Sequence, residues 1–119
     1  MNLQNNPACL FSPIFKHLSH ELSDHELTFH QAIETYGERA QELIAVEEMA
    51  ELIKEIMKCH RYGIQPTEAM MKEFVDVCIV MAQLEIILNW HIERAPEKMW
   101  NEWVYKMDRL KAKINEHTQ

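Results

Sequence analysis

Apolar side chains recur every three to four residues along most of the chain after position 23, and this spacing predicts α-helices. The pattern is interrupted at Gly37, at Gly63 and close to Pro96. Glycine and proline are poor residues for the interior of a helix and common at its ends. No stretch alternates apolar and polar residues as a half-buried strand would. We therefore expect an all-α fold, a four-helix bundle, with helices at residues 24–36, 38–61, 68–90 and 96–115.

Local signals mark several of the expected helix ends. Ser23 and Glu26 have the spacing of a capping box at a helix start. Gly63 suits a C-terminal cap, and Pro66 with Thr67 precedes the third helix. Residues 1–23 have no sustained period and contain two prolines. We expect them to form an irregular N-terminal arm, followed by a single helical domain over residues 24–119.

Composition narrows the class of protein. With 119 residues, 47% hydrophobic and 26% charged, the chain fits one globular domain. Only two glycines are present, too few for the phosphate-binding loops of Rossmann or P-loop proteins. The net charge of −7 argues against nucleic-acid binding. Three cysteines without a CxxC spacing, no secretory signal and no membrane-length apolar run indicate a soluble protein of the reducing cytoplasm.

Acidic residues gather on one side of the second helix. At 100° per residue, Glu47, Glu51, Glu55 and Lys58 fall on one charged stripe next to Glu48, and the opposite arc is apolar. Taken alone, such a stripe is typical of a solvated helix face.

The third helix changes this interpretation. Residues 74–88 are apolar nearly all round, so the helix should be largely buried, yet Asp76 lies within this run and Glu73 precedes it by three residues. A carboxylate in apolar surroundings must be protonated or find a cation. That cation is either a basic residue such as Arg109 or a metal ion. If Glu48, Glu51, Glu73 and Asp76 converge from antiparallel helices, Mg²⁺ or Mn²⁺ is the natural counter-charge.

The two acid pairs and their setting resemble a known family. The segments "YGERAQELIAVEEMAELIKEIMKCHRYG" and "EFVDVCIVMAQLEIIL" resemble the MazG-like, all-α nucleoside triphosphate pyrophosphohydrolases, whose signature is EExxE followed by ExxD. The resemblance implies hydrolysis of a nucleoside or deoxynucleoside triphosphate to the monophosphate and pyrophosphate. It also implies Mg²⁺ ions, for which Mn²⁺ substitutes, and assembly as a homodimer or homotetramer.

Residue roles follow from the same resemblance. It assigns the metal ions to Glu48, Glu51, Glu73 and Asp76, and catalytic roles to Glu48 and Glu47. Glu47 would lie in the outer shell of the metal site or help to orient the attacking water. Phosphate contacts would come from Lys54 and, in the last helix, Lys106 and Arg109. The last helix departs from the family pattern, because Leu110 stands where many members carry an asparagine four residues after the lysine. His30 and Ile33 are candidates for the wall of a base pocket, although the helical spacing favours core packing for both.

Other chemistries fit the sequence less well. No glutamate has a histidine three residues later, so a ferritin-like di-iron site is disfavoured. Trp90, Trp100 and Trp103 surround the last expected turn and are typical of core or interface packing. The expected partners exclude nucleic acid and membrane. A different class of function remains open, a helical interaction or regulatory module that keeps the bundle without catalysis.

Overall fold

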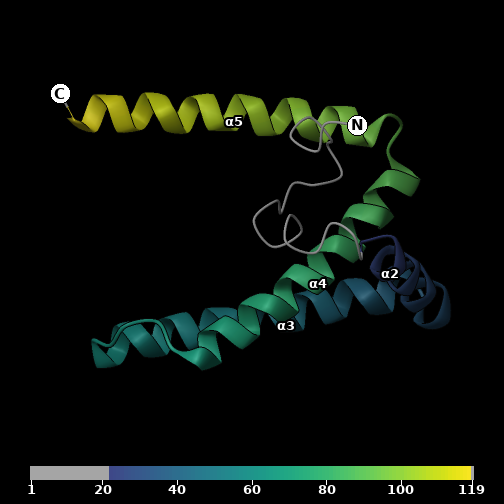
Figure 1. Cartoon of the computed structure of the whole chain (residues 1–119), viewed down its shortest axis with the longest axis horizontal. Coiled ribbons are helices and arrows are strands. Elements are labelled where there is room, and N and C mark those ends of the chain that lie inside the picture. Colours follow the sequence, from purple (N-terminus) through teal and green to yellow (C-terminus); the bar gives the residue numbers. More distant parts are fainter. Residues whose placement is uncertain (1–21, 119) are drawn as a thin grey trace.

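The computed structural model describes residues 22–118 and shows an all-α fold in this part of the chain (Figure 1). Four helices follow one another and no strand occurs among the described residues. The predicted fold class is therefore confirmed. The helices are α2 (Leu22–Tyr36), α3 (Glu38–Tyr62), α4 (Glu68–His91) and α5 (Ala95–Thr118).

Most helix ends lie within three residues of their predicted positions. The start of α2 differs from the prediction. We expected Ser23 to cap the helix, but α2 begins at Leu22 and Ser23 lies within it. The predicted irregular arm falls almost entirely on residues 1–21, outside the described part of the chain.

Two glycines adopt backbone conformations that other residues rarely reach. Gly37 separates α2 from α3 with a φ of 96°, and Gly63 ends α3 with a φ of 59°. The amides of Gly63 and Ile64 donate to the carbonyls of His60 and Cys59 in the pattern of a Schellman cap. These bonds satisfy two carbonyls that the helix itself leaves free, and the chain can then reverse into α4.

The start of α4 is fixed by a side-chain cap. The Thr67 hydroxyl accepts a hydrogen bond of 3.2 Å from the Met70 amide, as the sequence predicted for this position.

Helices α3 and α4 form an antiparallel pair that is the centre of the molecule, and α2 packs across both (Figure 1). The side chains of Gln41 and Gln83 meet inside this pair through a buried hydrogen bond of 2.7 Å. Where α2 crosses, Ile33 packs with Ile86 and Ile87 in a small core that Phe29 and Leu84 extend.

Helix α5 extends away from the other three helices (Figure 1). It contacts α4 mainly near the turn between them, where Arg94 has a φ of 58° and its guanidinium pairs with the Glu97 carboxylate at 2.7 Å. The radius of gyration is 16.5 Å, against about 13.5 Å for a compact domain of this length. Much apolar surface is consequently uncovered.

Helix α4 is less buried than its composition predicts. Phe74, Val75 and Ile79 are all more than 40% exposed, because α3 and α2 cover only part of its circumference and α5 does not lie against this half. The expectation of a largely buried helix was wrong at these positions, whereas residues 80–87 are all buried or half-buried. Among the described helices, none has the length and apolar character needed to cross a membrane.

Candidate metal centre

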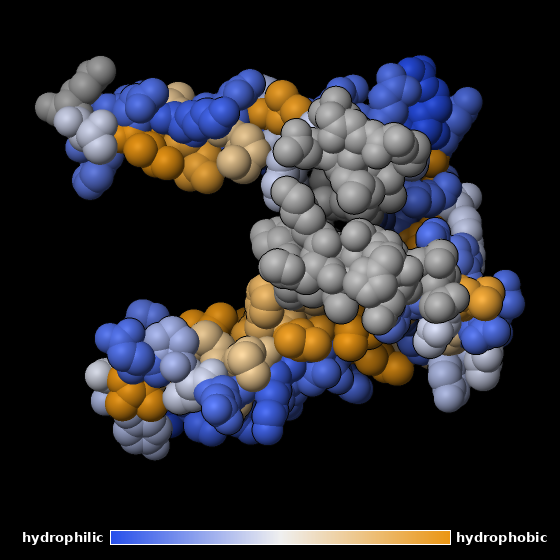
Figure 2. All heavy atoms as spheres, in the orientation of Figure 1, coloured by the Kyte–Doolittle hydropathy of each residue, from blue (hydrophilic) through white to orange (hydrophobic). Residues whose placement is uncertain are grey.

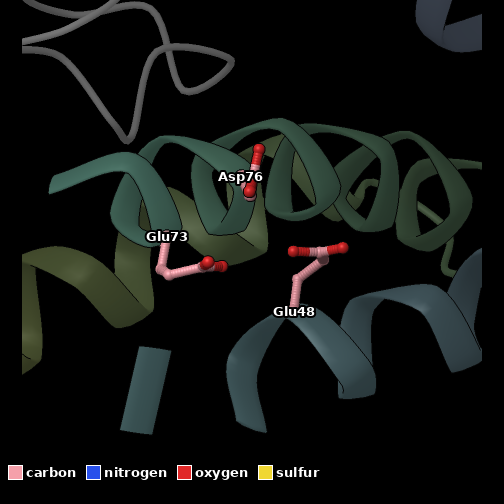
Figure 3. Close-up of side chains that lie close together, drawn as sticks. All are labelled: Glu48, Glu73 and Asp76. Atoms are coloured by element: carbon pink, nitrogen blue, oxygen red, sulfur yellow. The ribbon is translucent and has the colours of Figure 1, made fainter. Parts of the chain in front are cut away.

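Three carboxylates meet between α3 and α4 (Figure 3). Glu48 projects from α3 toward Glu73 and Asp76 of α4, and one oxygen from each lies within 4.8 Å of the others. Glu48 and Glu73 are half-buried and Asp76 is exposed. The three carboxylates are therefore partly covered by protein on the side of Glu48 and Glu73 and open to solvent at Asp76.

The register of the helix pair explains why these side chains meet. Gln41 lies opposite Gln83. Glu48 follows Gln41 by seven residues and Asp76 precedes Gln83 by seven, which is two helical turns in each case. In an antiparallel pair these two steps run in the same direction, so Glu48 arrives opposite Asp76. Glu73, one turn before Asp76 on the same side of α4, completes the group.

The electrostatics of the group favour a cation. Burial raises the pKa of the Glu48 carboxyl above its usual value, and the charges of Asp76, Glu73, Glu47 and Glu51 raise it further. Each of these causes disfavours the charged form of Glu48. A bound cation would offset them all.

No basic side chain supplies that charge in the described part of the chain. None of its ion pairs includes Glu48, Glu73 or Asp76. Arg109, considered above as a partner for Asp76, lies on α5 and its guanidinium stacks over the Tyr105 ring at 5.9 Å. The buried ion pair is therefore not found, and Asp76 is exposed where we expected it in an apolar interior.

The chemistry of the donors fits a hard divalent cation. Carboxylate oxygens are the ligands that Mg²⁺ and Mn²⁺ prefer, and Mg²⁺ commonly keeps several waters beside one or two protein carboxylates. The open side at Asp76 leaves room for water or phosphate oxygens.

The other predicted acidic residues surround this group. Glu51 is not among the three that converge, but its charge contributes to the raised pKa of Glu48. Glu47 is exposed beside Glu48. Lys54 is exposed on α3, and its neighbour Lys58 pairs with Glu55 at 3.4 Å.

The structure separates the predicted phosphate contacts of α5 from the carboxylates. Lys106 lines an open hollow of about 410 Å³ in the angle between α4 and α5, together with Leu88, Ile92 and Trp103. None of the ion pairs among the described residues joins Lys106 or Arg109 to Glu48, Glu73 or Asp76.

The two base-pocket candidates have different surroundings. Ile33 is 2% exposed and belongs to the core, as its helical spacing favoured. The His30 ring lies 5.5 Å from the Trp90 ring and its Nε2 lies 3.9 Å from a Glu26 oxygen. His30 is thus half-buried where α2 meets α4.

Three polar residues important to the helix interfaces were not singled out from the sequence. Gln41 and Gln83 form a buried hydrogen bond in the same register of α3 and α4 that brings the acidic group together. Glu85 has one buried carboxylate oxygen without a hydrogen-bond partner in the described part of the chain. Both Gln83 and Glu85 interrupt the apolar run of α4, and that interruption was the available signal.

Comparisons with known proteins identify no relative: no family model, no curated protein and no solved structure matches the chain.

Proposed function

We propose that the chain is a Mg²⁺-dependent nucleotide pyrophosphohydrolase. It cleaves a nucleoside or deoxynucleoside triphosphate between the α and β phosphates, giving the monophosphate and pyrophosphate. The observation that carries the proposal is the convergence of Glu48, Glu73 and Asp76 at an open site without a basic partner in the described residues.

The reaction proposed for these carboxylates is inferred from the resemblance to MazG-like enzymes. Glu48 belongs to the EExxE motif, and Glu73 and Asp76 form the ExxD motif. The structure brings the two motifs to one place although 25 positions separate Glu48 from Glu73. A solvated acidic stripe confined to α3 would not need the acids of α4.

Each residue has a defined task in this proposal. Glu48, Glu73 and Asp76 hold Mg²⁺, and Glu51 joins them or stabilises the ion by its charge. Bound Mg²⁺ neutralises charge on the phosphoryl oxygens and lowers the pKa of a bound water, so no protein nucleophile is required. Glu47 is exposed beside the group and orients the attacking water. Lys54 contributes positive charge for the outer phosphates.

In this proposal the protein is a cytoplasmic enzyme that acts on the nucleotide pool and works as a homodimer or homotetramer. The large uncovered apolar surface of the single chain supports assembly. Mn²⁺ should replace Mg²⁺, because both ions take oxygen ligands.

Product analysis tests the reaction. The protein is incubated with a panel of ribo- and deoxynucleoside triphosphates in Mg²⁺ or in excess EDTA, and the products are separated by ion-exchange chromatography. We expect monophosphate and pyrophosphate from at least one substrate, only with the metal. Glu73→Gln should abolish the reaction and Glu116→Gln, at an exposed residue near the end of α5, should not. Orthophosphate as the first product, or full activity in EDTA, would contradict the proposal.

A second candidate function rests on the same uncovered surface. Exposed apolar side chains on α3, α4 and α5 favour a non-catalytic helical interaction module. Absence of hydrolysis across the whole panel, with no Mg²⁺ binding, would favour this alternative.

A further inference from the structure

Helix α5 carries a continuous apolar seam that the described part of the chain leaves largely uncovered. Its members recur with alternating spacings of three and four residues, as in paired helices. We call this set the α5 seam: Trp100, Trp103, Met107, Leu110 and Ile114. Trp100 is half-buried and the other four are exposed. Figure 2 shows apolar side chains along one side of α5 and polar ones along the other.

The exposed side chains of the α5 seam leave room for a partner helix. Four of them are between 36% and 53% exposed: Trp103, Met107, Leu110 and Ile114. A standard protein interface buries about 800 Å² on each partner. Helix α5 has 24 residues, about 36 Å of length, so a second helix of the same length can lie along the whole seam.

From these features we propose that α5 pairs antiparallel with α5 of a second copy, through the α5 seam, across a two-fold axis at Met107. The inference does not depend on the proposed enzymatic function. It assigns the contact surface of the dimer, which the sequence did not indicate.

The sizes of the seam residues favour the antiparallel direction. The seam has two tryptophans near its start and Leu110 and Ile114 near its end. Antiparallel pairing about Met107 places each bulky indole against a smaller aliphatic side chain of the second copy. Parallel pairing would oppose indole to indole, and close packing is achieved best where large groups meet small ones.

The charges flanking the seam favour the same direction. Lys113 follows Met107 by six residues and Glu102 precedes it by five, and the two lie on the same flank of the seam. Antiparallel pairing about Met107 places each Lys113 near Glu102 of the second copy. Parallel pairing would align the lysines of both copies, and like charges between neighbouring helices destabilise the pair.

The first experiment measures mass. Multi-angle light scattering of the wild-type chain at micromolar concentration should give at least twice 14.2 kDa. Leu110→Glu should give half the wild-type mass or less, with the helical circular dichroism retained because Leu110 is 48% exposed in the single chain. The matched control is Tyr105→Glu, which alters an exposed side chain on the opposite side of α5 and should keep the wild-type mass.

The second experiment measures direction. A short bis-maleimide should cross-link the Met107→Cys variant into a covalent dimer, beyond any background from the wild-type cysteines. It should not cross-link Ile114→Cys, because antiparallel pairing separates the two copies of position 114 by 14 residues, about 21 Å along the axis.

Three results would overturn the proposal. A monomeric wild type would show that α5 pairs with no second copy. Cross-linking of Ile114→Cys as efficient as that of Met107→Cys would show parallel pairing. Loss of mass in Leu110→Glu without cross-linking of Met107→Cys would show that the α5 seam packs on a different surface of the second copy, such as the exposed apolar residues of α3.

Discussion

Glu85 is a carboxylate whose surroundings disfavour its charge. Burial, with a smaller contribution from the charge of Glu26, raises its pKa to about 7. One of its oxygens is buried without a hydrogen-bond partner in the described part of the chain. Ionisation of Glu85 in the folded protein is therefore a cost to stability at neutral pH.

The substitution Glu85→Gln should remove this cost. The unfolded carboxyl ionises near pH 4.5, and the folded one near pH 7. As pH rises through this window, only the unfolded state releases its proton, so the free energy of unfolding of the wild type falls. The full shift corresponds to about 3 kcal/mol, which partial exposure reduces to about 1 to 2 kcal/mol. Glu85→Gln should exceed the wild type by that amount at pH 8 and match it at pH 4.

Urea denaturation between pH 4 and pH 8 measures this difference. Glu116→Gln, the same substitution at an exposed site, should follow the pH dependence of the wild type. A Glu85→Gln variant that loses as much stability as the wild type between pH 4.5 and pH 7 would contradict the assignment.

Glu48 should make Mg²⁺ affinity sensitive to pH. Its pKa is raised by burial and by neighbouring carboxylates, and the metal binds only the deprotonated carboxylate. Affinity should therefore fall as pH is lowered toward the raised pKa. Calorimetric titration of Mg²⁺ from pH 7.5 down to pH 5 checks this, and Glu48→Gln should bind weakly at every pH. An affinity that did not change over this range would argue against Glu48 as a ligand.

The buried amide pair of Gln41 and Gln83 joins α3 to α4 by a hydrogen bond of 2.7 Å. Each side chain is 6% exposed, and Gln41 Oε1 has no partner in the described part of the chain. Gln83→Leu leaves the Gln41 amide group unpaired in the interior, which should cost about 1 to 3 kcal/mol. The double variant Gln41→Leu with Gln83→Leu should recover most of that loss, because two apolar groups then face each other.

A double-mutant cycle by chemical denaturation measures the coupling. Strictly additive effects of the two substitutions would show that the pair contributes no specific contact. If the pair also specifies register, the double variant should bind Mg²⁺ more weakly than wild type even where its stability is restored.

The sequence predicted the helices well because their signals are local. The glycines, the Thr67 cap and the spacing of apolar residues act within a few positions, and the observed helices follow them closely. Glu73 and Asp76 were expected on the same side of α4 for the same reason, because residues three apart share one side of a helix.

The sequence could not establish that Glu48 lies close to Glu73 and Asp76. This proximity depends on the pairing of α3 with α4, in which Gln41 and Gln83 meet across 42 positions of sequence. Helical spacing within either helix does not contain that information. The exposure of Asp76 was missed for a related reason, since the apolar composition of α4 exceeds what its neighbours in the chain cover.

The molecule as a whole consists of a helix pair with a candidate metal centre and an α5 that extends away from it (Figure 1). Among the described residues, no ion pair joins Lys106 or Arg109 of α5 to these carboxylates. The three residues of the candidate metal centre come from α3 and α4 alone. Substitutions of the α5 seam and of the carboxylates should have separable effects, the first on mass and the second on Mg²⁺ binding.

The central claim is that Glu48, Glu73 and Asp76 bind a divalent cation, and thermal unfolding with and without Mg²⁺ tests it most directly. Wild type with Mg²⁺ at 100 times its dissociation constant should gain about 2.7 kcal/mol, visible as a higher Tm. Asp76→Asn should largely lack this gain, yet without metal it should be as stable as wild type or more so, because one repelling charge is removed. Asp108→Asn on α5 serves as the matched control and should gain as wild type does. If Mg²⁺ leaves the wild-type Tm unchanged and Asp76→Asn is several kcal/mol less stable, the carboxylates are not a metal site and the proposed hydrolysis fails with them.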